Sequence, residues 1–168
     1  MDFELLDSLL GAIAYHDLAR IITFHLMGEP FIYPRIFEGI ESAVRRSLRL
    51  HLTTNGSTFH LFPDHIERLV RSRVPKVTIS LQTPDPETFQ LRGAPPRLAS
   101  ENYFEGIVEY VRANLRSAAS PTRIHIKFLD TTPHPFLVPH KPMTVVAGKA
   151  HMTEELTRWA RRLLTGLS

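Results

Sequence analysis

Apolar residues along the chain follow two spacings, one typical of strands and the other of helices. Four segments alternate apolar and polar residues over most of their length, as a strand with one buried face does: 20–26, 48–53, 76–82 and 122–129. Around them, apolar residues recur every three to four positions, which predicts helices over 2–15, 34–47, 63–72, 100–117 and 152–164. Pro34, Pro63 and the run 85–87 (Asp-Pro-Glu) mark helix starts, because proline and acidic residues favour the first turn. Strands that alternate with helices predict βαβ units and a parallel sheet.

Each predicted strand has an apolar face and a polar face. The polar faces hold Thr23, His25, Arg49, His51, Thr53, Thr78, Ser80, Gln82, His125 and Lys127. In a flat parallel sheet with helices on both sides, strands are apolar throughout. A polar stripe on all four strands therefore predicts an α/β fold of the barrel type, curved around a hydrated or ligand-filled concave side. An antiparallel α+β sheet with one face in solvent is the alternative that stays open.

The length and composition are those of one globular domain. The chain has 168 residues, of which 43% are hydrophobic and 22% are charged, so a disordered chain is excluded. We expect a single domain over 1–168, in which 131–168 contributes a proline-rich loop, a fifth strand at 143–147 and the last helix. No apolar run approaches the roughly 20 residues that span a bilayer, and no signal peptide is visible, so we expect a cytoplasmic protein.

The charge balance is mildly basic, with 20 Lys and Arg against 17 Asp and Glu. Sixteen of the basic residues are arginine, a side chain suited to carboxylate or phosphate contacts. This balance permits an anionic ligand without requiring one. No basic patch interleaved with aromatic residues is visible, so nucleic acid is not an expected partner.

Polar residues and glycines gather where the predicted strands end, which is where barrels and open α/β sheets bind ligands. The candidate site residues there are Gly28, Glu29, Pro30, Asn55, Ser80, Gln82 and Arg92. Glu29 could accept hydrogen bonds from an ammonium group, and Arg92 could hold a carboxylate. Simpler explanations exist for single residues, because Asn55-Gly56 is also a common turn and Arg92 could satisfy carbonyls at a helix end.

Three of these segments together resemble the radical S-adenosylmethionine (radical SAM) enzymes. The run 22–30 (Ile-Thr-Phe-His-Leu-Met-Gly-Glu-Pro) is similar to their Gly-Gly-Glu-Pro motif, with Met27 in place of the first glycine. The run 52–57 (Leu-Thr-Thr-Asn-Gly-Ser) is similar to the Thr-Asn-Gly motif after the next family strand. Segments 79–83 and 89–93 resemble the Ser-x-Asp…Arg-Gly segment, with Gln82 where Asp is common. The motifs occur in family order and at family spacing over roughly residues 1–130.

The resemblance implies a fold, a cofactor and residue roles. The family fold is a partial (βα) barrel of the TIM-barrel type, and the expected small molecule is S-adenosylmethionine (SAM). Gly28, Glu29 and Pro30 match the segment that holds the amino group of SAM, and Asn55 matches a turn that shapes the site. Ser80, Gln82 and Arg92 match positions that contact its ribose or carboxylate. No family motif is visible from Pro133 onward.

The chain contains no cysteine, which excludes disulfides, thiolate nucleophiles and zinc–thiolate sites. Radical SAM enzymes hold a [4Fe–4S] cluster with Cys-x3-Cys-x2-Cys in the loop after the first barrel strand, a loop that would precede the helix predicted over 2–15. Without cluster ligands, the chain has no one-electron donor with which to cleave SAM. We therefore expect an N-terminally truncated core of a SAM-dependent radical enzyme that is inactive alone.

Two other functions stay open. The chain could be a non-catalytic module that binds SAM or a partner chain. It could also be a phosphosugar enzyme that uses Glu29 and a histidine as acid–base groups, although the glycine-rich phosphate loop is absent.

Histidines and one predicted strand add two further expectations. His25, His51 and His125 share the polar face and could meet as a metal or acid–base cluster if their strands are neighbours, whereas His60, His65, His134 and His140 show no ligand spacing. If a preceding strand is missing, strand 20–26 is an exposed edge through which chains should associate.

Overall fold

Four strands and a set of helices alternate along the chain, as the apolar spacing predicts. The computed structural model describes residues 2–25, 28–91, 100–117, 122–128 and 148–166. The strands are β1 (Ile22–Phe24), β2 (Leu50–Thr54), β3 (Lys76–Gln82) and β4 (Arg123–Phe128). The helices are α1 (Phe3–Tyr15), the 3₁₀ turn η1 (Pro30–Ile32), α2 (Ile36–Arg45), α3 (Pro63–Arg71), α4 (Pro86–Leu91), α5 (Glu101–Arg116) and α6 (Gly148–Leu164). The strand expected at 143–147 and the proline-rich loop before it lie outside the described residues.

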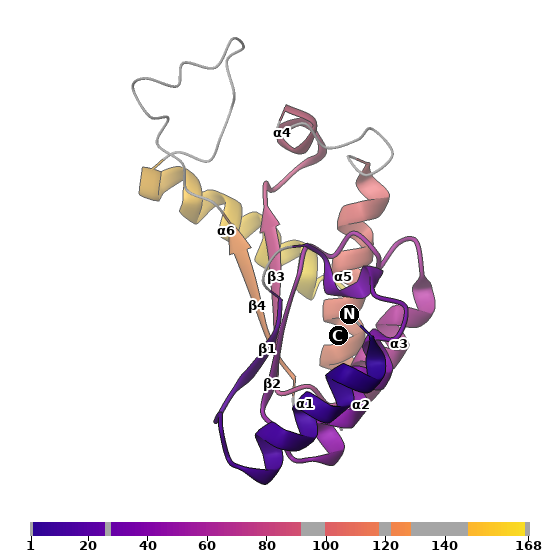
Figure 1. The fold of residues 1–168 in the computed structure, drawn as a ribbon. Coiled ribbons are helices and arrows are strands. Elements are labelled where there is room, and N and C mark those ends of the chain that lie inside the picture. Colours follow the sequence, from indigo (N-terminus) through magenta and orange to yellow (C-terminus); the bar gives the residue numbers. More distant parts are fainter. Residues whose placement is uncertain (1, 26–27, 92–99, 118–121, 129–147, 167–168) are drawn as a thin grey trace.

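The strands form one parallel sheet in the order β1-β2-β3-β4. The antiparallel alternative is therefore wrong, because each strand is followed by a crossover that returns the chain to the same end of the sheet. In Figure 1 helices α1, α2, α3 and α5 lie on one side of the sheet, and we call the side that these four helices do not cover the open face. A sequential parallel sheet with helices along one face is the arrangement of a partial (βα) barrel, as predicted.

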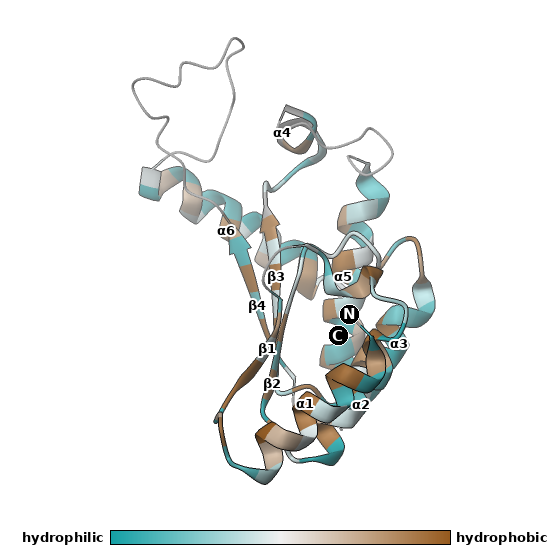
Figure 2. Ribbon diagram, in the orientation of Figure 1, coloured by the Kyte–Doolittle hydropathy of each residue, from teal (hydrophilic) through white to brown (hydrophobic). Residues whose placement is uncertain are grey.

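The apolar strand faces point into the helix layer and form the core. Leu50, Leu52, Val77 and Ile79 have no exposed surface, and helix residues such as Ile40, Leu69 and Ile107 are equally inaccessible. Of the open-face residues between them, Thr53 on β2 keeps partial contact with solvent, whereas Thr78 on β3 is buried. Figure 2 shows the resulting alternation of hydrophobic and hydrophilic residues along the strands. The one-faced strand pattern predicted from the sequence is confirmed.

The second helix begins later than its proline predicts. Pro34 was expected to open a helix at 34, but α2 starts at Ile36, and the turn η1 occupies the residues just before. The Tyr33 amide donates to the Pro30 carbonyl at 3.0 Å, which closes η1, and the Ile36 amide donates to the Tyr33 carbonyl at 3.1 Å. Pro34 therefore lies in the turn between the two, whereas Pro63 does open α3 as expected.

Helix α6 joins the same helix layer through its tryptophan. Trp159 is buried, and its indole nitrogen donates a hydrogen bond to the Pro84 carbonyl at 3.1 Å. Its ring centroid lies 6.0 Å from those of Phe104 on α5 and Phe128 on β4. Because Phe128 is on the apolar strand face, α6 covers the β4 end of that face. None of the described helices is both long and apolar enough to cross a membrane.

Candidate functional site

The buried carboxylate of Glu29 joins the carboxyl ends of β1 and β2. Its Oε1 accepts hydrogen bonds from the Thr54 hydroxyl at 2.7 Å and the Phe31 amide at 3.2 Å. Its Oε2 accepts one from the Asn55 amide at 2.7 Å. Only 9% of Glu29 is exposed. The segment 28–30 is therefore attached to the turn that follows β2, so two of the predicted motifs are in contact.

The Thr54-Asn55-Gly56 turn is held by its own side chains and by helix α5. The Thr54 hydroxyl accepts from the Gly56 amide at 2.9 Å, and the Asn55 side-chain oxygen accepts from the Ser57 amide at 2.8 Å. Gly56 has φ +75°, and a Cβ there would lie 2.8 Å from Ile107 Cγ1. Both the backbone conformation and the close approach to α5 therefore require glycine at this position.

Tyr103 ties this turn to the end of β3. Its hydroxyl donates to the Asn55 carbonyl at 2.6 Å, and its ring stacks on Phe89 of α4 with centroids 4.8 Å apart. Tyr103 is almost completely buried at the start of α5. A chain of contacts thus runs from Glu29 through Asn55 and Tyr103 to Phe89.

Burial dominates the acid–base chemistry of this cluster. It raises the pKa of Glu29 above its ordinary value, and the hydrogen bonds from Asn55, Thr54 and Phe31 oppose that rise. Burial also raises the pKa of the Tyr103 hydroxyl, and the nearby Glu29 carboxylate adds to the effect. These groups therefore resist gaining negative charge, which suits a structural link better than a solvent-exposed base.

Gly28 is the exposed member of the segment. Its φ is +105°, a conformation that side-chain-bearing residues rarely adopt, and a Cβ built there would meet nothing within 4 Å. The backbone at Gly28 is thus open on the side that lacks a side chain. A ligand can approach the main chain here, as the glycine in the sequence predicts.

The predicted contributors from β3 are only partly brought together. Ser80 lies on the open face, partly exposed, opposite Lys127 of β4. The β3–β4 register shifts between Ser80 and Gln82, so the regular alternation that predicted both on one face is interrupted there. Arg92 lies outside the described residues.

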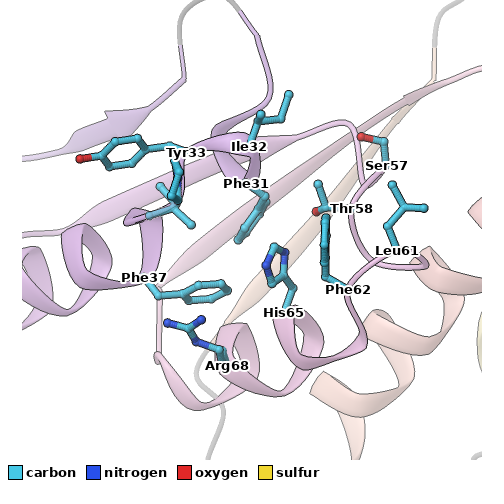
Figure 3. Close-up of a pocket in the computed structure, with 12 residues that line it drawn as sticks. Phe31, Ile32, Tyr33, Phe37, Ser57, Thr58, Leu61, Phe62, His65 and Arg68 are labelled. Atoms are coloured by element: carbon cyan, nitrogen blue, oxygen red, sulfur yellow. The ribbon is translucent and has the colours of Figure 1, made fainter. Parts of the chain in front are cut away.

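An apolar pocket lies behind the Glu29 segment, in the helix layer. Its volume is about 470 Å³, and it is bordered by η1, the start of α2, the residues after β2, and α3. Figure 3 shows His65 and Arg68 of α3 facing Phe31, Phe37 and Phe62. Arg68 lies over the Phe37 ring, 4.0 Å from its centroid. This pocket shares Phe31 with η1 but opens among the helices, not on the open face of the sheet.

The three open-face histidines do not form a cluster. The register pairs His51 with Thr23 and Lys76, whereas His125 pairs with Thr78, one row further along the sheet and two strands away. Among the described residues, no group of three or more histidines and carboxylates could hold a metal ion. The expectation of a metal site formed by His25, His51 and His125 is therefore wrong for the described residues, and His51 and His125 lie two strands and one row apart.

A comparison with models of protein families identifies the family of this chain. The model of the radical SAM superfamily matches residues 1–126, three quarters of the sequence. The chain belongs to the radical SAM superfamily. One solved structure that it matches is the crystal structure of archaeal TYW1, at 15% identity and a TM-score of 0.48. That match covers 78% of this chain but only 44% of the TYW1 chain. A comparison with curated proteins found no match.

The two groups that bind in this superfamily fit the chain unequally. The [4Fe–4S] cluster does not fit, because the sequence has no cysteine and therefore offers no thiolate ligand. SAM fits better, because the open backbone at Gly28 lies beside a segment held rigidly by Glu29. The Glu29 carboxylate itself is already occupied by three donors, which leaves its backbone neighbours as the accessible groups.

The candidate residues predicted from the sequence did not include two members of the Glu29 cluster, Thr54 and Tyr103. A signal for Thr54 was present, because it follows Leu50 and Leu52 in the buried alternation and is polar where an apolar residue was expected. A hydroxyl in a buried row needs a partner, and here that partner is Glu29. Tyr103 had no such signal, since its link to Asn55 joins residues 48 positions apart.

Proposed function

We propose that this chain is the SAM-binding part of a radical SAM barrel, which holds SAM at the carboxyl ends of β1, β2 and β3 without cleaving it on its own. The observation that carries the proposal is the Glu29 carboxylate, which binds Thr54 and Asn55 and so fixes the Gly28–Pro30 segment. Superfamily membership supports SAM as the ligand.

Each residue has a distinct task in this proposal. The exposed backbone at Gly28 meets the amino group of SAM, and Glu29 is a positioning residue that keeps this backbone in place. Asn55 shapes the adjoining turn, and Pro30 starts η1. Ser80, on the open face, together with Gln82 and Arg92, contacts the ribose or the carboxylate.

Isothermal titration calorimetry of the purified chain with SAM tests this function. We expect Gly28→Ala to weaken SAM binding by about tenfold or more, because the added Cβ strains the backbone at the ligand. Gly166→Ala is the matched control, since Gly166 also has positive φ and open space but follows α6. No heat with SAM, or equal losses in the two variants, would contradict the proposal.

An acid–base role for Glu29 in phosphosugar chemistry has weaker support. Both carboxylate oxygens are engaged by Thr54, Asn55 and Phe31, and no histidine is among these donors. A general base must reach the proton it removes, and the 9% exposure of Glu29 leaves little room for this.

Association through β1 is a second candidate function, favoured by its place at the sheet edge. Among the described residues β1 pairs only with β2. The Ile22 amide donates to the Arg49 carbonyl at 3.0 Å, so the amide of the next residue, Thr23, points to the free edge. Thr23→Pro should therefore lower self-association measured by light scattering, while β1–β2 pairing stays intact. A wild-type chain that is monomeric at every concentration would exclude this function.

A further inference from the structure

The open face of the sheet collects positive charge. The cationic and imidazole side chains there are Arg49, His51, Lys76, Arg123, His125 and Lys127. Their orientation follows from the alternation, because the residues between them on each strand point into the core or pack against it.

Three of these residues lie side by side across three strands. His51 of β2 is opposite Lys76 of β3, and Lys76 is opposite Arg123 of β4. Thr23 of β1 extends the same row. Neighbouring strands are about 4.8 Å apart, so the three nitrogen-bearing side chains start within about 10 Å of one another. We call Thr23, His51, Lys76 and Arg123 the cationic row.

No carboxylate balances the cationic row within the described part of the chain. None of the four strands contains an aspartate or glutamate. The ion pairs among described residues all use arginines of the helices or of the residues that flank α2. Neither Lys76 nor Arg123 takes part in one of them.

The remaining sequence cannot supply the missing charge either. The segments 26–27, 92–99, 118–121 and 129–147 together contain one acidic residue, Asp130. The same segments add three further cations, Arg92, Arg97 and Lys141. Whatever the position of these residues, they add more positive than negative charge. Among the described residues, no ion pair neutralises Lys76 or Arg123.

The electrostatic environment of His51 agrees with this concentration of charge. Burial lowers the pKa of His51, and Lys76, Arg49 and His125 lower it further. The two cations Lys76 and Arg49, with the His125 imidazole, thus place His51 in a positive potential. An anion placed there would gain from every one of them.

We propose that the cationic row binds a small, multiply charged phosphate anion, of the diphosphate or triphosphate class. The row presents an ammonium, a guanidinium, an imidazole and a hydroxyl, and each of these groups can donate a hydrogen bond to a phosphate oxygen. The row lies at the amino-terminal half of the strands, and Thr54 is three residues further along β2, about 10 Å from His51. The site is thus separate from the one assigned to SAM.

Titration of the full chain with inorganic pyrophosphate by calorimetry tests this site. We expect Lys76→Gln combined with Arg123→Gln to weaken pyrophosphate binding by about tenfold or more, because two charge-assisted contacts are lost. The control pairs Arg45→Gln with Arg71→Gln, which removes the same charge from exposed helix positions. Equal weakening in both double variants would show a net-charge effect only and would overturn the proposal, as would the absence of pyrophosphate binding.

Two further measurements identify the class of ligand and control for misfolding of the variants. If a single-stranded oligonucleotide bound at the row and excess pyrophosphate did not displace it, the ligand would be a phosphodiester backbone and the small-anion proposal would be wrong. SAM binding by the row variant should equal that of the wild type. Loss of both ligands together would indicate misfolding, which circular dichroism detects, and Lys76→Gln alone then provides the milder test with an expected severalfold loss.

Discussion

The helix layer and the open face of the sheet treat charge in opposite ways. In the helix layer, Arg46 binds Asp7 through two 3.0 Å contacts and also binds Ser42. Arg162 pairs with both Glu101 and Glu105. On the open face, Lys76 and Arg123 lie next to each other with no acidic partner among the described residues.

This difference indicates that the two regions contribute to different properties, stability and ligand binding. In the helix layer these arginines lie beside the apolar core with their acidic partners in place. Their charges therefore lower the folding stability little. Unpaired like charges in one row oppose folding slightly and stay available for a ligand. The stability of the protein should therefore come from the helix side of each strand, and its binding capacity from the open side and the strand ends.

The largest expected effect is a difference in the free energy of unfolding between substitutions at two adjacent residues of β2. Leu52 is completely buried under the helices, and Leu52→Ala should lower the free energy of unfolding by about 2–5 kcal/mol because it leaves a cavity. Thr53, on the open face, should change it by less than about 0.5 kcal/mol when replaced by alanine. Urea unfolding followed by circular dichroism measures both, and similar losses would break the comparison.

Two helical glycines sharpen the comparison within the helix layer. A Cβ at Gly106 would lie 2.8 Å from the His60 backbone nitrogen, so Gly106→Ala should cost about 1–3 kcal/mol. At Gly11 the nearest atom belongs to the flexible Arg46 side chain at 3.7 Å, so Gly11→Ala should stabilise the helix by up to about 1 kcal/mol. Thermal melting distinguishes the two, and a stabilising Gly106→Ala would refute the close packing of α5.

Glu29 should make stability depend on pH in a direction opposite to most carboxylates. Because its pKa in the folded chain is raised above the ordinary 4.5, folding favours the protonated form. Its contribution is present in full below pH 4.5 and is lost as the pH rises through the raised pKa. The wild-type stability minus that of Glu29→Gln should therefore fall as the pH rises, measured by urea unfolding in a pH series. A difference that grew with pH would show that the hydrogen bonds outweigh burial.

The smallest effects should differ in sign. Arg46→Gln removes the partner of Asp7 and should cost about 0.5–1 kcal/mol. Lys76→Gln relieves repulsion in the cationic row and should stabilise the chain by a few tenths, roughly 0.3 kcal/mol. Both effects on the free energy of unfolding should be smaller in 1 M salt, because the Debye length falls to about 3 Å. Destabilisation by both variants would mean that Lys76 has a partner after all.

Much of the fold could be predicted from the sequence because its signal is local. Alternation with period two located β3 at 76–82 and placed Leu52 and Ile79 on the buried side. Proline at the first turn located the start of α3, but Pro34 misled, because the capping of η1 by Glu29 moved the start of the next helix. The competing signal was itself local, because Glu29 caps a 3₁₀ turn that begins four residues before Pro34.

The sequence and the tertiary structure each determined a different part of the chemistry of this protein. The sequence by itself determined that no cysteine can bind a cluster, that the strands have a polar face, and that the Gly28–Pro30 segment resembles a family motif. Only the tertiary structure decided that the Glu29 carboxylate turns inward to Thr54 and Asn55, and that His51 aligns with Lys76 and Arg123. The reason is physical, since a strand's pattern states which face a residue takes, while the register between parallel strands depends on how the connecting helices pack.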